Sequence, residues 1–78
     1  MGSLTKRSVN LAGHATSLAL EPEFWRVLDQ CAAEQAISIA ALIQRLDAGR
    51  GDRPLASACR VFALLHAAEG RGASPPAT

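Results

Sequence analysis

The segment of residues 14–20 constrains the fold more than any other part of the sequence, because its apolar residues recur at every second position. This period of two is typical of a β-strand with one buried face. The predicted buried face carries Thr16, Leu18 and Leu20, and the other face carries Ala15, Ser17 and Ala19. A short strand leaves backbone N–H and C=O groups unpaired along its edges, so it requires a partner strand.

Two different partner strands are possible for residues 14–20. Residues 8–11 alternate in the same way, and Gly13 lies where the odd or even parity of the apolar residues changes, so a turn or bulge there would give a hairpin within one chain. Two such short strands are marginal in isolation. We therefore expect residues 1–13 to form a basic N-terminal arm, and the strand to pair antiparallel with its copy in a second chain.

Helical spacing begins directly after the strand. Glu21-Pro22-Glu23 is typical of a helix start, since proline has no N–H to leave unpaired and the glutamates favour the positive end of the helix dipole. The spacing predicts a helix over 22–35, with Trp25 at the boundary of its apolar stripe. Ser38 is the predicted N-cap of a second helix over 38–48.

Pro54 opens a third predicted helix, over 54–69, whose apolar residues cover more than one narrow stripe. A helix with this distribution is buried on more than one side, which in a short chain predicts contact with another subunit. The segment 70–78 is rich in Gly, Ala, Ser and Pro, and we expect it to be a disordered tail.

The chain has 78 residues, enough for one small domain, and a core of this size usually needs a staple, a metal or a second chain. Cys31 and Cys59 lie within helical apolar patterns, so we expect reduced core thiols rather than a disulfide framework. The potential ligands His14, Cys31, Cys59 and His66 are scattered singly, and we expect no metal site. A second chain is the remaining source of stability.

The net charge of +1 conceals an uneven distribution, with +2 in residues 1–20, −3 in residues 21–47 and +2 in residues 48–78. A basic leading segment favours an anionic partner at that end of the molecule. We find no run of apolar residues long enough to span a membrane and no secretory signal, and we expect a cytoplasmic protein with no membrane partner.

Nothing in the sequence indicates catalysis. His14 and His66 are separated by the whole helical region, and Gly49-Arg50-Gly51 lacks the Lys and Ser or Thr of a phosphate-binding loop. We therefore predict no enzymatic activity, no catalytic residue, no cofactor and no small-molecule substrate.

The chain resembles the ribbon-helix-helix DNA-binding proteins, in particular short bacterial members with a third helix. The residues that carry the resemblance are Lys6-Arg7-Ser8-Val9, Gly13-His14, Thr16-Ser17-Leu18-Ala19-Leu20-Glu21-Pro22-Glu23-Phe24-Trp25, Leu28, Ile37-Ser38, Leu42-Ile43, Leu46-Asp47 and Leu55-Ala56-Ser57-Ala58-Cys59-Arg60-Val61. It implies a mainly α fold with one short strand, and an intertwined homodimer joined by an antiparallel two-stranded ribbon. Such proteins are typically transcriptional regulators or antitoxins that bind double-stranded DNA.

Three groups of site residues follow from the resemblance. The positions expected to face DNA bases are Ala15, Ser17 and Ala19. Those expected to contact phosphate or backbone are Lys6, Arg7, His14, Ser38, Ile39 and Ala40. The expected dimer core is Thr16, Leu18, Leu20, Phe24, Leu28, Leu42, Ile43 and Leu46.

The base-facing positions depart from the family pattern, which usually places Arg, Lys, Asn, Gln or Thr there. Ser17 can make one hydrogen bond and alanine can touch a thymine methyl, so sequence readout by Ala15, Ser17 and Ala19 should be weak. The leading hypothesis is a dimeric DNA-binding transcriptional regulator. The alternative is an antitoxin-like oligomerisation or partner-binding module that uses the helix over 54–69 and binds DNA weakly or not at all. The same helix is the expected site at which chains form a homodimer or a higher assembly.

Overall fold

Residues 5–20 form a β-hairpin within one chain. The computed structural model describes residues 3–72, and in it β1 (Thr5–Leu11) pairs antiparallel with β2 (His14–Leu20), from Thr5 opposite Leu20 to Leu11 opposite His14. The two-residue loop between the strands has positive φ at both positions, 52° at Ala12 and 86° at Gly13. This is what a type I′ hairpin turn requires.

The hairpin corrects two expectations. The chain has two strands rather than one, and residues 5–11 are a strand rather than part of a basic arm. The partner of β2 within this chain is β1, so pairing with a second copy is not needed to complete a two-stranded ribbon.

The physical reason is the parity change at the turn. A two-residue loop places odd residues of β1 opposite even residues of β2, so all the strongly apolar strand residues reach one face: Val9, Leu11, Leu18 and Leu20 are all buried. A hairpin of this length is marginal when isolated. Here the helices cover its apolar face, so packing against them stabilises the hairpin.

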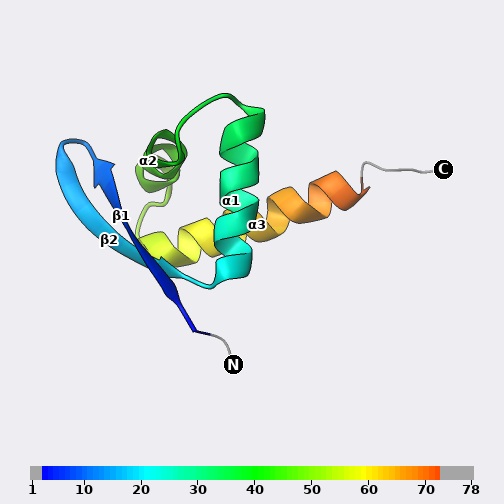
Figure 1. Cartoon of the computed structure of the whole chain (residues 1–78), viewed down its shortest axis with the longest axis horizontal. Helices are drawn as coiled ribbons and strands as arrows, with labels where there is room; N and C mark the ends of the chain where they lie inside the picture. Colours follow the sequence, from blue (N-terminus) through cyan, green and yellow to red (C-terminus); the bar gives the residue numbers. More distant parts are fainter. Residues whose placement is uncertain (1–2, 73–78) are drawn as a thin grey trace.

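Three helices follow the hairpin: α1 (Pro22–Glu34), α2 (Ile39–Gly49) and α3 (Leu55–Gly72). In Figure 1 the hairpin curves along one side of the helices, α1 crosses α3, and α2 lies beside β1. α3 continues beyond residue 69 into residues expected to be a disordered tail, and residues 73–78 of that expected tail lie outside the described part. Within residues 3–72, no helix is both long and apolar enough to cross a bilayer.

The ends of α1 and α2 are set by local hydrogen bonds. At the end of α1, Ala36 has a φ of 58° and the N–H of Ile37 donates to the carbonyl of Ala32 at 3.0 Å. This is the Schellman arrangement, which reverses the chain after a helix. The hydroxyl oxygen of Ser38 then accepts the N–H of Ala41 at 3.0 Å, so Ser38 is the N-cap of α2.

The core lies between the hairpin and the helices. Its buried members are Val9, Leu11, Leu18, Leu20, Trp25, Leu28, Cys31, Ala32, Leu42, Ile43, Cys59 and Ala63. Trp25 is only 2% exposed and therefore lies inside the core, not at its boundary as expected. Both thiols are free and buried, and burial raises the pKa of Cys59 to about 11, so this thiol stays protonated at neutral pH.

Candidate nucleic-acid interface

The hairpin presents one face away from the helices, which we call the outer ribbon face. It consists of three cross-strand pairs, Lys6 with Ala19, Ser8 with Ser17 and Asn10 with Ala15. Five of these six residues are exposed, and Ala19 is half-buried. The face has one cation and no carboxylate, and small side chains from β2 leave room around the longer ones from β1.

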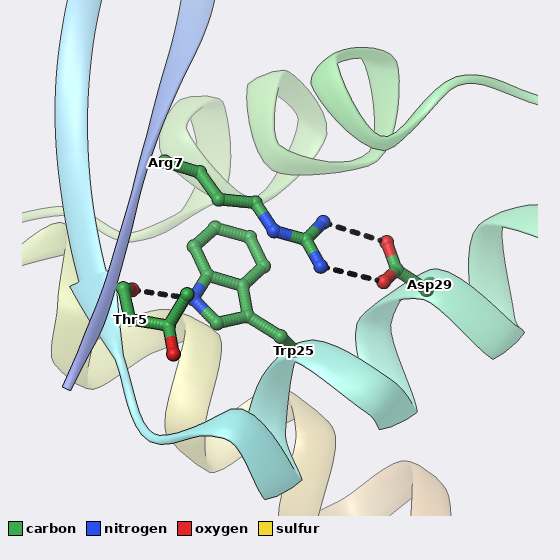
Figure 2. A network of polar contacts seen from close by, with 4 residues as sticks. All are labelled: Thr5, Arg7, Trp25 and Asp29. Carbon is green, nitrogen blue, oxygen red and sulfur yellow. Dashed lines mark hydrogen bonds and ion pairs between the residues drawn. The ribbon is translucent and has the colours of Figure 1, made fainter. Parts of the chain in front are cut away.

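The opposite side, the inner ribbon face, carries the pairs Thr5 with Leu20, Arg7 with Leu18, Val9 with Thr16 and Leu11 with His14. Besides its apolar residues it includes a polar network that joins β1 to α1 (Figure 2). The Nη1 and Nη2 atoms of Arg7 donate to the two carboxylate oxygens of Asp29 at 3.0 and 2.9 Å. The same guanidinium lies 4.3 Å from the centre of the Trp25 ring, a cation–π contact.

Trp25 connects this network to the first residue of β1. Its indole Nε1–H donates to the backbone carbonyl of Thr5 at 2.7 Å, at the start of β1. The hydrogen bonds that Arg7 donates to Asp29 raise the pKa of Arg7 above its ordinary value, so the guanidinium stays charged. These contacts fix β1 on α1 and explain why Trp25 is buried.

The residues expected to contact phosphate are separated by this arrangement. Lys6 lies on the outer ribbon face, whereas Arg7 points inward to Asp29. A phosphate contact by Arg7 would require breaking its bidentate pair. His14 is exposed next to the turn, in the position opposite Leu11.

The start of α2 has the geometry that an anion prefers. Ser38 caps the N–H of Ala41, while the N–H groups of Ile39 and Ala40 belong to the first turn, where no intrahelical acceptor exists. The positive end of the helix dipole adds to their attraction for an anion. Ser38 is exposed and the next two residues are half-buried, and their contact with phosphate stays a prediction.

Most of the residues expected in a dimer core are buried inside a single chain. Leu18, Leu20, Leu28, Leu42 and Ile43 are each at most 4% exposed, and Thr16, Phe24 and Leu46 are half-buried. These side chains therefore build the core between one hairpin and its own helices. Their burial requires no second copy.

Most carboxylates of residues 21–47 lie beside a basic side chain. Glu21 accepts a hydrogen bond from Arg60 at 2.9 Å, which lowers the pKa of Glu21. Asp47 pairs with Arg50 at 2.7 Å, and Glu34 lies 3.4 Å from His66. Together with Asp29, these carboxylates lie on helices or at their starts, away from the outer ribbon face.

Ser8 and Asn10 are exposed residues of the outer ribbon face that the sequence interpretation did not include among the candidates. The signal was present, because Val9 and Leu11 are buried and their neighbours must then point outward. Treating residues 1–13 as an arm removed them from consideration. The hairpin places both beside Ser17 and Ala15, on the same face as the base-facing candidates.

Comparison with known proteins agrees with this architecture. The profile described as "Ribbon-helix-helix domain" matches residues 4–67. No curated protein matches the sequence. The solved structure of an uncharacterized protein from Bordetella pertussis Tohama I is similar, with 35% identity and a TM-score of 0.80, and the match covers 96% of this chain and 64% of that one. This chain therefore belongs to the ribbon-helix-helix domain family.

Proposed function

We propose that the protein is a DNA-binding transcriptional regulator that places its outer ribbon face in the major groove. The observation that supports this most is the division of the hairpin into a buried inner face and an exposed, acid-free outer face. A two-stranded ribbon fits the major groove of B-DNA. In this position Ala15 and Ala19 can touch thymine methyl groups, and the Ser17 hydroxyl can bond a base edge.

Phosphate contacts on either side of the groove would hold the ribbon in register. We assign them to His14 when it is protonated and to the first-turn amides that follow Ser38 at Ile39 and Ala40. The helix start supplies oriented N–H groups for a phosphate oxygen.

A second copy of the chain is the proposed partner of α3. Val61, Leu64, Leu65 and Ala68 are all exposed and recur at spacings of three and four residues, and we call them the α3 stripe. Leu64 is 64% exposed and Leu65 is 57% exposed. The other side of the same helix packs into the core through Cys59 and Ala63. A helix that is apolar on both sides is expected to bury the second side as well.

We favour self-association through α3 over an intertwined ribbon made by two copies of β2. Pairing β2 with its copy would extend the two hairpins into a four-stranded sheet. Its outer strands would lie about 14 Å apart, from a strand spacing of about 4.8 Å. The major groove is about 12 Å wide, so a single hairpin fits it and the four-stranded sheet does not.

Fluorescence anisotropy with a random-sequence duplex tests the proposal. Four phosphate contacts from two chains would weaken binding about 150-fold between about 50 and 200 mM salt, since each contact adds about −0.9 to the slope of log K against log salt. Ser8→Glu puts a carboxylate at the centre of the outer ribbon face and should weaken binding at least about tenfold. Gln44→Glu adds the same charge on the exposed side of α2 and serves as the matched control.

Two results would contradict the proposal. One is the absence of duplex binding by the wild-type chain at the lowest salt. The other is an equal loss of affinity in Ser8→Glu and Gln44→Glu, which would show that total charge matters and the outer ribbon face does not.

The α3 stripe also favours a second candidate function, an antitoxin-like module that docks on a different polypeptide. Light scattering separates the two. Self-association predicts a clean multiple of the 8.2 kDa chain mass, and Leu64→Glu combined with Leu65→Glu should reduce it to one chain. A wild-type chain that is monomeric or of ill-defined mass would favour an absent partner, and a double variant that stays dimeric would favour pairing through β2.

A further inference from the structure

β1 divides its side chains between two tasks. Arg7, Val9 and Leu11 face inward and hold the strand on the helices. Lys6, Ser8 and Asn10 face outward, and all three are exposed. Within residues 3–72, none of these three side chains takes part in a hydrogen bond or ion pair with the rest of the protein.

The cross-strand partners make these three side chains prominent. Lys6 stands opposite Ala19 and Asn10 stands opposite Ala15, so at each end of the outer ribbon face a long polar group projects past a methyl group. Ser8 and Ser17 form the centre of the face with two short hydroxyl side chains. β1, and not β2, therefore supplies the groups that reach farthest from the ribbon.

The chemistry of these groups matches base edges in the major groove. A lysine ammonium donates to O6 and N7 of guanine, and an asparagine carboxamide both donates to and accepts from adenine at N7 and N6. Lys6 and Asn10 are four residues apart along a strand, which is about 13 Å. The rise of DNA is about 3.4 Å per base pair, so this distance corresponds to about four base-pair steps.

The ribbon is also held rigidly enough to fix this spacing. The tight two-residue turn joins the strands at one end, and the Trp25 and Asp29 contacts hold β1 near its other end. Side chains on a rigid element lose less freedom on binding than side chains on a flexible arm.

We propose that Lys6 and Asn10 determine the sequence specificity of the ribbon, Lys6 by contacting guanine and Asn10 by contacting adenine about four base-pair steps away. Ser8 lies over the base pairs between them. This inference rests on the proposed function, because it names the side chains that read the groove which the outer ribbon face enters.

Selection of bound duplexes from a random-sequence library tests the assignment. The wild-type chain should enrich a guanine and an adenine separated by about four steps. Asn10→Ala should lose the adenine preference and keep the guanine preference, and Lys6→Ala should do the reverse. On the selected duplex, Asn10→Ala should weaken binding roughly 5- to 150-fold, the discrimination that one bidentate base contact provides. On random duplex its affinity should change less than about threefold.

Gln44→Ala is the matched control, because it removes a carboxamide, the same group that Asn10→Ala removes, from an exposed position of α2 away from the outer ribbon face. It should leave both preferences in place. Circular dichroism melting curves of all variants should agree with that of the wild type, since the three positions are exposed.

The outcomes separate this inference from the proposed function. If the wild-type chain binds no duplex, the proposed function fails and this inference fails with it. The wild-type chain could bind duplex while Lys6→Ala and Asn10→Ala select the same sequences as the wild type. That result would overturn only the assignment of base contacts to β1. An Asn10→Ala variant that weakens on all duplexes equally would also overturn it, because that pattern belongs to a backbone contact.

Discussion

The two faces of the hairpin have opposite properties although their residues alternate along the same two strands. The inner ribbon face buries Val9, Leu11, Leu18 and Leu20 and uses Arg7 in a network with α1. The outer ribbon face has no apolar residue larger than alanine and leaves its polar side chains without protein partners within the described part of the chain. One period-two pattern thus produces a structural surface and a free surface on one small ribbon.

This difference shows why β1 matters for both stability and function. The inward residues of β1 cover Trp25 and complete the core. The outward residues of β1 supply the longer polar side chains of the outer ribbon face. A variant on one face should therefore affect folding, and its sequence neighbour on the other face should affect binding.

The largest expected effect is that of a charge placed on the inner ribbon face. Leu18 is 4% exposed, so Leu18→Lys should destabilise the fold by about 3 to 5 kcal/mol, the cost of a buried charge without a partner. Its neighbour Ser17 is exposed, and Ser17→Lys should change stability by less than about 0.5 kcal/mol while it tightens duplex binding. Urea denaturation followed by circular dichroism measures both. A folded Leu18→Lys and an unfolded Ser17→Lys would mean that the faces are reversed.

A smaller effect is expected at the junction of the ribbon with α1. Trp25→Phe removes the hydrogen bond to Thr5 and part of a buried ring, and should lower the unfolding free energy by about 2 kcal/mol. Amide hydrogen exchange should become faster in β1 than in α2. Asp29→Asn is the comparison variant, with a loss of at most about 1 kcal/mol, because the ion pair is 37% and 45% exposed. Equal exchange throughout the chain would show that Trp25 does not hold β1.

The turn that aligns the two faces can be made more stable. Ala12 has a φ of 52°, which costs a residue other than glycine or asparagine about 1 kcal/mol. Ala12→Asn should raise the unfolding free energy by about 0.5 to 1 kcal/mol, since Asn-Gly is a favoured type I′ pair. Gly13→Ala should lower it, because φ is 86° there. Thermal denaturation tests both, and a destabilised Ala12→Asn would contradict this turn.

The smallest expected effect is a change in the pH dependence of stability. The hydrogen bond from Arg60 lowers the pKa of Glu21 below its ordinary value of 4.5, so the folded chain binds this proton more weakly than the unfolded chain does. The stabilisation is therefore present above about pH 4.5 and is lost as the pH falls through the folded pKa. Glu21→Gln should flatten the acid limb of the curve of unfolding free energy against pH. An unchanged limb would show that other carboxylates control it.

Local signals made much of the fold predictable. The alternation of residues 14–20 matches β2, Pro22 begins α1, and Ser38 caps α2 as its position before an apolar helix indicates. Each of these features depends on a few neighbouring residues. The sequence pattern therefore contains most of the information needed to locate them.

The pairing of β1 and the burial of Trp25 were not predictable in the same way. Residues 5–11 are too short to form a stable hairpin with β2 alone, and they do so here because helices cover the inner ribbon face. Trp25 lies beside the apolar stripe of its helix, which predicted a boundary position, and the strand that covers it, β1, was expected to be part of a basic arm. One error in pairing thus also hid Ser8 and Asn10 from the candidate site.

The most direct test of the central claim is a titration of the isotopically labelled chain with duplex DNA, followed by amide chemical shifts in NMR spectra. If the outer ribbon face meets DNA, the largest shifts should fall on Lys6, Ser8, Asn10, Ala15 and Ser17, with smaller ones at the start of α2. The exposed α3 stripe should show little change. Shifts concentrated on α3, with the hairpin unaffected, would contradict the account.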